Sequence, residues 1–238
     1  MTRMPEFVAP RAILFDLDGT LLDSLPDLVR SANAMRAALG EPPLDRELVS
    51  RFVGNGVRNL VHRVLTGRVD GQADASRFER GFAIFRSIYL EGCCVESRLR
   101  PGAVETLAAL RGRGIACGVL TNKSEAPMRR ILEHYGLAPH LGAAIGGDTE
   151  FGRKPDPVGA FEAARRMGVD PRRDHCWLVG DSMTDLQTAV AAGMSAIAIR
   201  GGYHHGDPFE RCDPRPAQVI ETLAELVGLA EMPVAWAR

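Results

Sequence analysis

The sequence contains no apolar run of the length that crosses a membrane, which takes about 20 consecutive residues. Its first ten residues, MTRMPEFVAP, also lack the apolar segment and the small-residue cleavage site of a secretory signal. These two absences predict a protein that makes no membrane contact. We therefore expect a cytoplasmic location.

The sequence has no marked excess of charge of either sign. Its 29 lysines and arginines against 30 aspartates and glutamates give a formal net charge of -1. A chain without a basic field has no general means of attracting nucleic acid or an anionic membrane surface. With 45% hydrophobic residues in 238 positions, it can bury the core of one domain with an insert, or of two small domains.

Cysteine is scarce and unpatterned. The five cysteines are an odd number, and no two of them have C-x-x-C spacing. This argues against a zinc site and against a disulfide framework. Cys117 and Cys176 lie in apolar runs and are interpreted as small core residues. The adjacent pair Cys93 and Cys94 receives no interpretation from the sequence.

What the sequence does have is a series of short apolar runs with little alternation, which is typical of parallel strands covered on both faces. Helix-like segments that end in glycine separate the later runs. The resulting strand–helix alternation predicts a doubly wound, Rossmann-like parallel α/β sheet. The predicted strands are residues 12–15 (AILF), 115–120 (IACGVL), 143–146 (AAIG), 176–180 (CWLVG) and 196–199 (AIAI).

Residues 23–99 interrupt this alternation, because three segments with helical spacing follow one another there without a convincing strand. They predict a helical insert directly after the first strand. Loops at the carboxyl ends of parallel strands are where ligands bind, so such an insert would lie over the site. Residues 216–230 (PAQVIETLAELVGLA) are interpreted as a closing helix.

The polar residues that follow the predicted strands should meet at one edge of the sheet. Several carboxylates gathered there need a cation, and Mg²⁺ fits oxygen ligands while leaving room for phosphate oxygens. A lysine, a hydroxyl and an amide beside them predict a phosphoryl site. The converging residues are Asp16 and Asp18, Thr121 and Asn122, Lys154, and Asp181 and Asp185.

Two of these residues suit particular chemical steps. Asp16, at the end of its strand, is placed to attack phosphorus as a carboxylate nucleophile. Asp18 could protonate the leaving oxygen and later accept a proton from water. Taken alone, Thr121 and Asn122 could form only a helix cap. Lys154 taken alone is typical of a solvated surface lysine. Their functional interpretation depends on the residues expected beside them.

At these positions the chain resembles the haloacid dehalogenase superfamily of phosphatases, whose four motifs correspond to DLDGT, VLTN, RKPDP and VGDSMTD. The resemblance implies that Asp16 becomes an aspartyl-phosphate and that Asp18 is the general acid and base. It also implies a catalytic core in residues 1–22 and 100–238 with a helical type-1 cap in residues 23–99. Thr121 and Asn122 would bind the phosphoryl group and Lys154 would steady the intermediate. Mg²⁺ would be bound by Asp16, the backbone carbonyl of Asp18 and Asp181, with Asp185 in support.

Within the superfamily the sequence is most similar to bacterial phosphoglycolate phosphatases, notably in FVGNGVRNLVHRVL. Gly54, Asn55 and Gly56 are therefore candidate substrate-binding residues of the cap, although they could form only a tight turn. The expected substrate is a small phosphorylated metabolite, 2-phosphoglycolate first. The alternatives are N-acetylmuramate 6-phosphate, another sugar phosphate, a phosphomutase, or a phospho-receiver signalling domain. A monomer or a homodimer is expected.

Four other residues could be given a role in binding. His204 and His205 resemble a metal pair, but adjacent loop histidines without a third ligand nearby favour a solvent-exposed position. Arg58 and His62 lie on successive turns of a helical segment and are typical of a solvated helix face.

Overall fold

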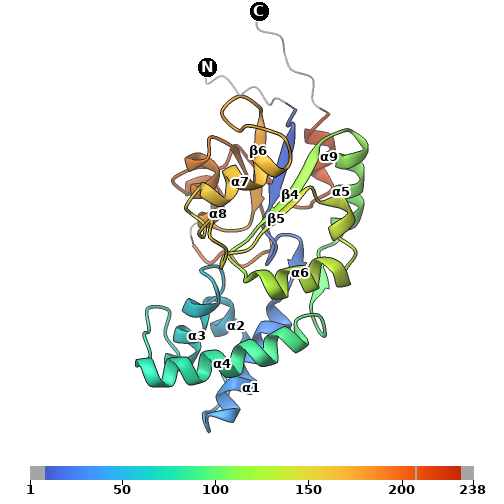
Figure 1. Cartoon of the computed structure of the whole chain (residues 1–238). Helices are drawn as coiled ribbons and strands as arrows, with labels where there is room; N and C mark the ends of the chain where they lie inside the picture. Colours follow the sequence, from blue (N-terminus) through green and yellow to red (C-terminus); the bar gives the residue numbers. More distant parts are fainter. Residues whose placement is uncertain (1–8, 207, 232–238) are drawn as a thin grey trace, which may run out of the picture.

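A parallel β-sheet of six strands forms the centre of the computed structural model, which describes residues 9–206 and 208–231 (Figure 1). The strand order is β5-β4-β1-β6-β7-β8, and every pairing within it is parallel. The fold class expected from the sequence is therefore confirmed. The strands are β1 (Ala12–Phe15), β4 (Ala116–Leu120), β5 (Ala143–Ile145), β6 (Cys176–Gly180), β7 (Ser195–Ile199) and β8 (Gln218–Ile220).

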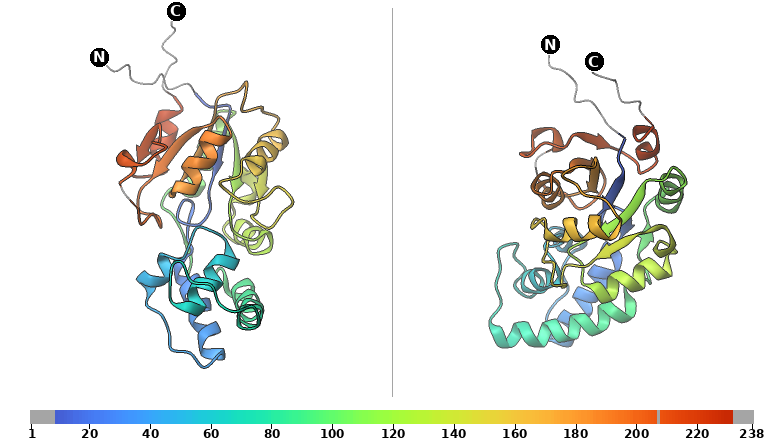
Figure 2. Two further views of the ribbon diagram at one scale, coloured as in Figure 1. Left: turned by 90° about the vertical axis from the view of Figure 1, so that its left-hand side faces the viewer. Right: turned by 45° about the horizontal axis from the view of Figure 1, so that its top comes forward.

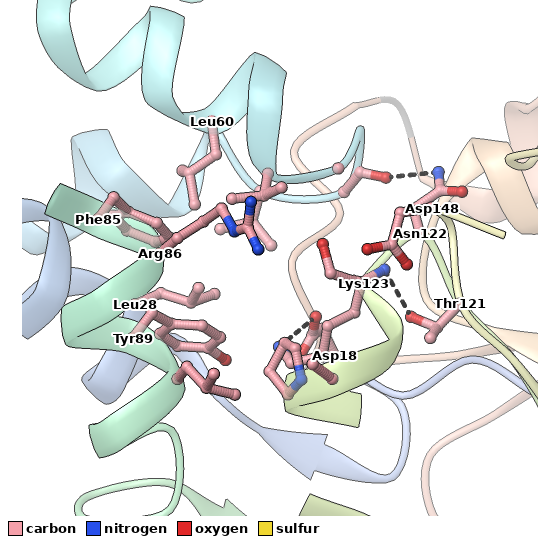
Figure 3. Close-up of a pocket in the computed structure, with 18 of the residues that line it drawn as sticks. Asp18, Leu28, Leu60, Phe85, Arg86, Tyr89, Thr121, Asn122, Lys123 and Asp148 are labelled. Atoms are coloured by element: carbon pink, nitrogen blue, oxygen red, sulfur yellow. Dashed lines mark hydrogen bonds and ion pairs between the residues drawn. The ribbon is translucent and has the colours of Figure 1, made fainter. Parts of the chain in front are cut away.

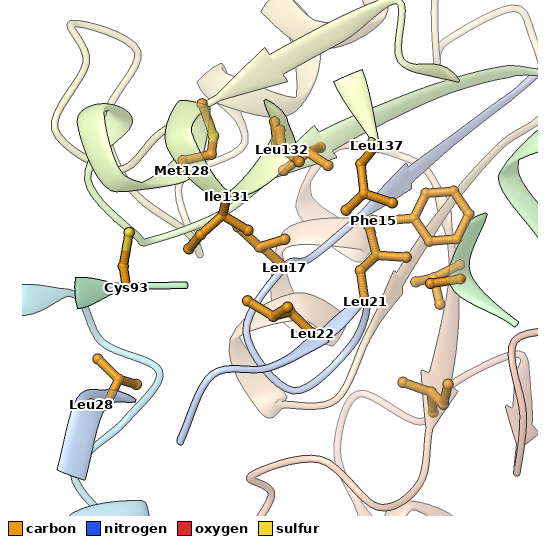
Figure 4. Packing of buried hydrophobic residues seen from close by; sticks show 14 of the residues in the cluster. Phe15, Leu17, Leu21, Leu22, Leu28, Cys93, Met128, Ile131, Leu132 and Leu137 are labelled. Carbon is orange, nitrogen blue, oxygen red and sulfur yellow. The ribbon is translucent and has the colours of Figure 1, made fainter. Parts of the chain in front are cut away.

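Successive residues of β1 are buried in two separate hydrophobic clusters, one on each face of the sheet. Ile13 and Phe15 pack with residues of α5, α6 and α9, as Figure 4 shows in part. Ala12 and Leu14 pack with residues of α7 and α8. This is why β1 is apolar at every position. The helices are α5 (Ala103–Gly112), α6 (Glu125–His134), α7 (Val158–Arg166), α8 (Met183–Ala191) and α9 (Glu225–Leu229).

The prediction of one closing helix over residues 216–230 was wrong in its first half. Residues 218–220 form the edge strand β8 beside β7, because the β-branched Val219 and Ile220 suit a half-buried sheet edge. The chain then turns. The side chain of Glu225 accepts hydrogen bonds from the backbone amides of Glu221 and Thr222, and α9 begins only at Glu225.

Four helices separate β2 (Leu22–Asp23) from β3 (Arg98–Leu99) and pack into a second body, here called the helical lobe (α1–α4, residues 25–92). It lies beyond the carboxyl ends of the sheet strands (Figures 1 and 2). The lobe consists of α1 (Leu25–Ala38), α2 (Arg46–Ser50), α3 (Val57–Thr66) and α4 (Ala75–Gly92).

The chain enters and leaves the helical lobe through β2 and β3, which pair antiparallel. The sequence did not predict this two-stranded ribbon, because strands of two residues are too short to show a period. The division into a core of residues 1–22 and 100–238 and a cap of residues 23–99 stays a prediction. Residues 1–8, 207 and 232–238 of that division, and with them most of the segment searched for a secretory signal, lie outside the described residues.

All five cysteines are free thiols. Cys117 and Cys176 are buried, as the apolar runs predicted, and the Cys93 and Cys94 sulfurs lie 3.8 Å apart, within hydrogen-bond distance and without a disulfide. Within the described part of the chain, no helix has the length and apolarity needed to cross a membrane.

Asp27 in α1 fixes the segment by which the chain leaves the helical lobe. Its buried carboxylate accepts hydrogen bonds from the amides of Val95, Glu96 and Ser97 at 3.0 Å each, and from the Ser97 hydroxyl at 2.7 Å. Burial would raise the pKa of Asp27, but these hydrogen bonds and one from Arg30 hold it below its usual value. A carboxylate with a lowered pKa stabilises the fold above the pKa of an unfolded aspartate, and the contribution disappears as the pH falls through the folded value.

We expect Asp27→Asn to lower the free energy of unfolding at pH 7 by about 2 kcal/mol, because an amide group would then face backbone amides that need an acceptor. The difference from the wild type should shrink as the pH falls below about 4, the pKa of an unfolded aspartate, because the unfolded chain then binds a proton that the folded carboxylate does not yet bind. Urea denaturation at pH 7 and pH 3 measures both effects. Asp70→Asn, at an exposed aspartate of the same lobe, is the control and should unfold like the wild type. Equal stability of Asp27→Asn and the wild type at pH 7 would contradict this account.

Candidate active site

Three carboxylates meet at the carboxyl ends of β1 and β6. Oxygens of Asp16, Asp181 and Asp185 all lie within 4.8 Å of one another, and the three groups are buried. Asp16 directly follows β1, Asp181 directly follows β6, and Asp185 lies in the first turn of α8. Because β1 and β6 are hydrogen-bonded neighbours, their ends necessarily bring these residues together.

The surrounding chain holds Asp181 in place. Its carboxylate accepts hydrogen bonds from the Thr20 hydroxyl at 2.9 Å and from the Tyr203 amide at 2.6 Å. Gly19 permits the approach, because it has φ +90° and a Cβ at that position would lie 2.4 Å from an Asp181 oxygen. The glycine of DLDGT is therefore required both by the turn and by the adjacent carboxylate.

Lys154 places its ammonium between two of the three carboxylates. Its Nζ lies 2.9 Å from Asp16 and 2.5 Å from Asp185, and the side chain is only 2% exposed. Asp185 also accepts hydrogen bonds from the amide and the hydroxyl of Ser182, which form a capping box at the start of α8. The expected convergence of Lys154 with Asp16, Asp181 and Asp185 is thus present in the structure.

The electrostatics of this group favour a bound cation. Burial, followed by repulsion from Asp185, raises the pKa of Asp16 to about 6 in spite of Lys154. Burial and repulsion from Asp16 and Asp185 raise the pKa of Asp181 to about 8. Burial alone would lower the pKa of Lys154, but its two carboxylate partners raise it. One ammonium therefore does not compensate three carboxylates. An oxygen-only donor set of this kind fits Mg²⁺.

Asp18, the fourth carboxylate expected in the cluster, points elsewhere. Both of its oxygens bind the ammonium of Lys123, at 2.7 and 2.8 Å, and the Lys123 side chain is only 4% exposed (Figure 3). The chain has left the sheet after Phe15, so the alternation of a strand no longer determines where the side chain of Asp18 points. Lys123 also lies 4.8 Å from the ring centre of Tyr89 in α4.

Sequence reasoning missed Lys123. It comes directly after Thr121 and Asn122, so it belongs to the same strand end and could have been included on that signal. A lysine that follows polar residues in a loop is normally solvated, however, and only the position of Asp18 shows that this one is paired.

Thr121 and Asn122 lie at the end of β4 and line a pocket together with Asp16 and Asp18. The Asn122 side-chain amide donates to the carbonyls of Gly54 and Lys154, at 3.0 and 3.1 Å. Both of its protons are therefore used by the protein, and its oxygen has no hydrogen-bond partner among the described residues. Asn122 ties the helical lobe to the loop that carries Lys154.

The pocket lies between the helical lobe and the sheet edge (Figure 3). Gly54 and Gly56 line it, and Asn55 does not. The exposed Asn55 instead accepts a hydrogen bond from Arg63 through its side-chain oxygen. Most of the lobe's lining is apolar: Leu28, Val53, Val57, Leu60, Phe85, Tyr89 and Leu90.

The remaining candidates have structural partners. His205 shares a 2.8 Å hydrogen bond with Ser50 in α2, and His204 stacks on Phe209. Neither histidine belongs to a cluster that could hold a metal within the described part of the chain. His62 stacks on Phe78 with ring centres 3.9 Å apart, and Arg58 forms an ion pair with Glu79 on the exposed face.

Comparison with known proteins agrees with this geometry. The sequence profile of haloacid dehalogenase-like hydrolases matches residues 10–193. A phosphoglycolate phosphatase of Chromobacterium violaceum is 40% identical over 81% of this chain and 86% of its own length. One of Neisseria meningitidis is 38% identical over 91% of this chain and 92% of its own length. The crystal structure of a predicted phosphoglycolate phosphatase from Haemophilus somnus superposes with a TM-score of 0.85 at 29% identity, covering 94% of this chain and 99% of that one.

We expect Mg²⁺ to raise the melting temperature of the protein, since a ligand at one hundred times its dissociation constant stabilises the folded state by about 2.7 kcal/mol. Asp181→Asn should remove most of this rise, because it neutralises one of the three clustered carboxylates. Thermal unfolding in EDTA and in Mg²⁺ measures the difference. Asp148→Asn, in the same pocket but outside the cluster, should keep the full rise. An undiminished rise in Asp181→Asn would show that the ion binds elsewhere.

Proposed function

The chain belongs to the haloacid dehalogenase-like hydrolase family, and on that basis we propose that it is a Mg²⁺-dependent phosphatase that converts 2-phosphoglycolate to glycolate and phosphate. The observation that carries the proposal is the pair of aspartates after β1. Asp16 lies among the clustered carboxylates, and Asp18 lies beside it in the pocket. The names of the relatives that cover most of the chain support this choice of substrate.

In the first step, an oxygen of Asp16 attacks the phosphorus atom and the bond from phosphorus to the substrate oxygen breaks. Asp18 gives its proton to that departing oxygen, which leaves as an alcohol. The product on the enzyme is an aspartyl-phosphate at Asp16. The Thr121 hydroxyl, at the end of the neighbouring strand β4, donates to a phosphoryl oxygen, and Asn122 positions the loops around it.

In the second step, water attacks the phosphorus atom of the aspartyl-phosphate. Asp18, now ionised, accepts the proton of the water, and the bond between Asp16 and phosphorus breaks to release phosphate. Lys154 neutralises the Asp16 carboxylate as it is released, because its ammonium lies 2.9 Å from that group.

Asp16, the backbone carbonyl of Asp18 and Asp181 would hold Mg²⁺, with Asp185 in support. The ion supplies positive charge for the phosphoryl oxygens. The helical lobe serves as the cap in this proposal. Its apolar side chains, with Gly54 and Gly56, close the pocket over the reacting groups and exclude bulk water.

The proposal places this reaction in the cytoplasm, where five free cysteines remain reduced without cost to the fold. The partner is a small phosphorylated metabolite. A monomer or a homodimer is compatible with the proposal, because the residues named for both steps come from one chain.

Phosphate release from a panel of small phosphate esters, with and without Mg²⁺, tests the function. Hydrolysis of 2-phosphoglycolate should exceed that of N-acetylmuramate 6-phosphate and of hexose phosphates and should stop in EDTA. Asp16→Asn should lower kcat by at least about 10⁴-fold, because an amide is a poor nucleophile, while its far-ultraviolet circular dichroism stays like that of the wild type. Retained turnover in this variant would contradict the aspartyl-phosphate. Isomerisation of a hexose phosphate without phosphate release would identify a phosphomutase. A phosphorylated protein that persists without turnover would identify a phospho-receiver domain.

Lys123→Met should lower kcat for 2-phosphoglycolate by about 10- to 100-fold, because Asp18 loses the partner that positions it for proton transfer. The loss should be smaller with p-nitrophenyl phosphate, whose leaving group departs without a proton. Lys123→Arg should restore part of the activity. Equal losses with both esters would mean that Lys123 supports the fold and not the proton transfer.

A further inference from the structure

We propose that Arg86, in α4 of the helical lobe, binds the carboxylate at the end of the substrate that is not hydrolysed. This inference rests on the proposed function and adds the residue that selects the substrate. A substrate such as 2-phosphoglycolate carries two anionic groups, and the residues assigned above account for only one of them, the phosphoryl group.

On the lobe side, the pocket lining contains one cation that could bind the second anion of the substrate. The lobe's lining is apolar apart from two glycines, the hydroxyl of Tyr89 and a single charged residue, Arg86. An anion placed against the apolar side chains would lose its water without compensation. Figure 3 shows the Arg86 guanidinium reaching from α4 toward the interior of the pocket, between the side chains of Leu60 and Lys123.

The cations on the sheet side are already occupied. Lys154 is bound by Asp16 and Asp185, and Lys123 is bound by both oxygens of Asp18. Asp148, the remaining charged lining residue, is an anion and lies on the far side of the pocket from α4 (Figure 3). A carboxylate therefore has one cation in the pocket that it can bind without breaking an existing ion pair.

Several arginines of the lobe, Arg51, Arg63, Arg80 and Arg86, have no carboxylate partner among the described residues, but of all the lobe's arginines Arg86 is the one that lines the pocket. Arg30, Arg36, Arg58 and Arg77 each form an ion pair with a carboxylate. No carboxylate of the described residues forms such a pair with Arg86, whose one recorded contact is with the face of Phe82, 5.7 Å from the ring centre. A guanidinium suits this task because it can bind both oxygens of a carboxylate at once.

The test compares Arg86→Gln with the wild type on two esters, 2-phosphoglycolate and ethyl phosphate, which lacks the carboxylate. One lost hydrogen-bonded charge pair corresponds to about a 10- to 100-fold change. We expect the ratio of kcat/KM for 2-phosphoglycolate over ethyl phosphate to fall by that factor, mainly through KM for 2-phosphoglycolate. Arg80→Gln is the matched control, because Arg80 is an exposed arginine of the same helix outside the pocket, and it should keep the wild-type ratio.

Binding is measured separately from turnover, by calorimetry of 2-phosphoglycolate with Asp16→Asn and with the double variant Asp16→Asn, Arg86→Gln in Mg²⁺. The dissociation constant should rise by the same 10- to 100-fold. An unchanged ratio and an unchanged dissociation constant would overturn the role of Arg86, while the wild-type activity would still support the phosphatase. Failure of the wild type to hydrolyse 2-phosphoglycolate would instead overturn the proposed function. A circular dichroism spectrum and a melting temperature like those of the wild type establish that Arg86→Gln is folded.

Discussion

The repulsion among three buried carboxylates is the constraint on which the rest of the site depends. Asp16, Asp181 and Asp185 lie within 4.8 Å of one another at the end of an apolar sheet. Lys154 offsets only part of their charge, while Thr20, Ser182 and the amide of Tyr203 hold the carboxylates by hydrogen bonds. The fold thus holds three carboxylates together with neighbours that do not neutralise them, and the resulting cluster could hold a metal ion.

The parallel sheet is what makes this concentration of charge compatible with a stable core. Helices cover both of its faces, so its central strands β1, β4 and β6 have no charged residue and the carboxylates appear only beyond their ends. The carboxyl ends of β1, β4 and β6 lie side by side, and each contributes residues to the site. The helical lobe lies over the same ends and contributes most of the apolar wall, so the chemistry and the shape of the pocket come from different parts of the chain.

Residues that stand in short local motifs could be predicted from the sequence, and contacts between residues distant in the sequence could not. Asp16, Asp181 and Lys154 were found because each stands in a short motif whose neighbours are informative. Asp18 and Lys123 form an ion pair although they are 105 residues apart in the sequence, and the residues around each of them give no sign of this pairing. The use of both Asn122 amide protons by the protein, and the edge strand β8 in place of a helix, likewise depend on neighbours distant in the sequence.

The antiparallel pairing of Leu22 with Leu99 and of Asp23 with Arg98 has a consequence for how this architecture can vary. The two connections to the helical lobe, β2 and β3, are paired strands. The segment between them is therefore attached to the sheet domain in the same way as the loop of a β-hairpin. Its length and content can change during evolution without moving a strand of the sheet or a carboxylate at its edge. The lobe's share of the pocket lining can therefore change while the carboxylates at the sheet edge keep their places.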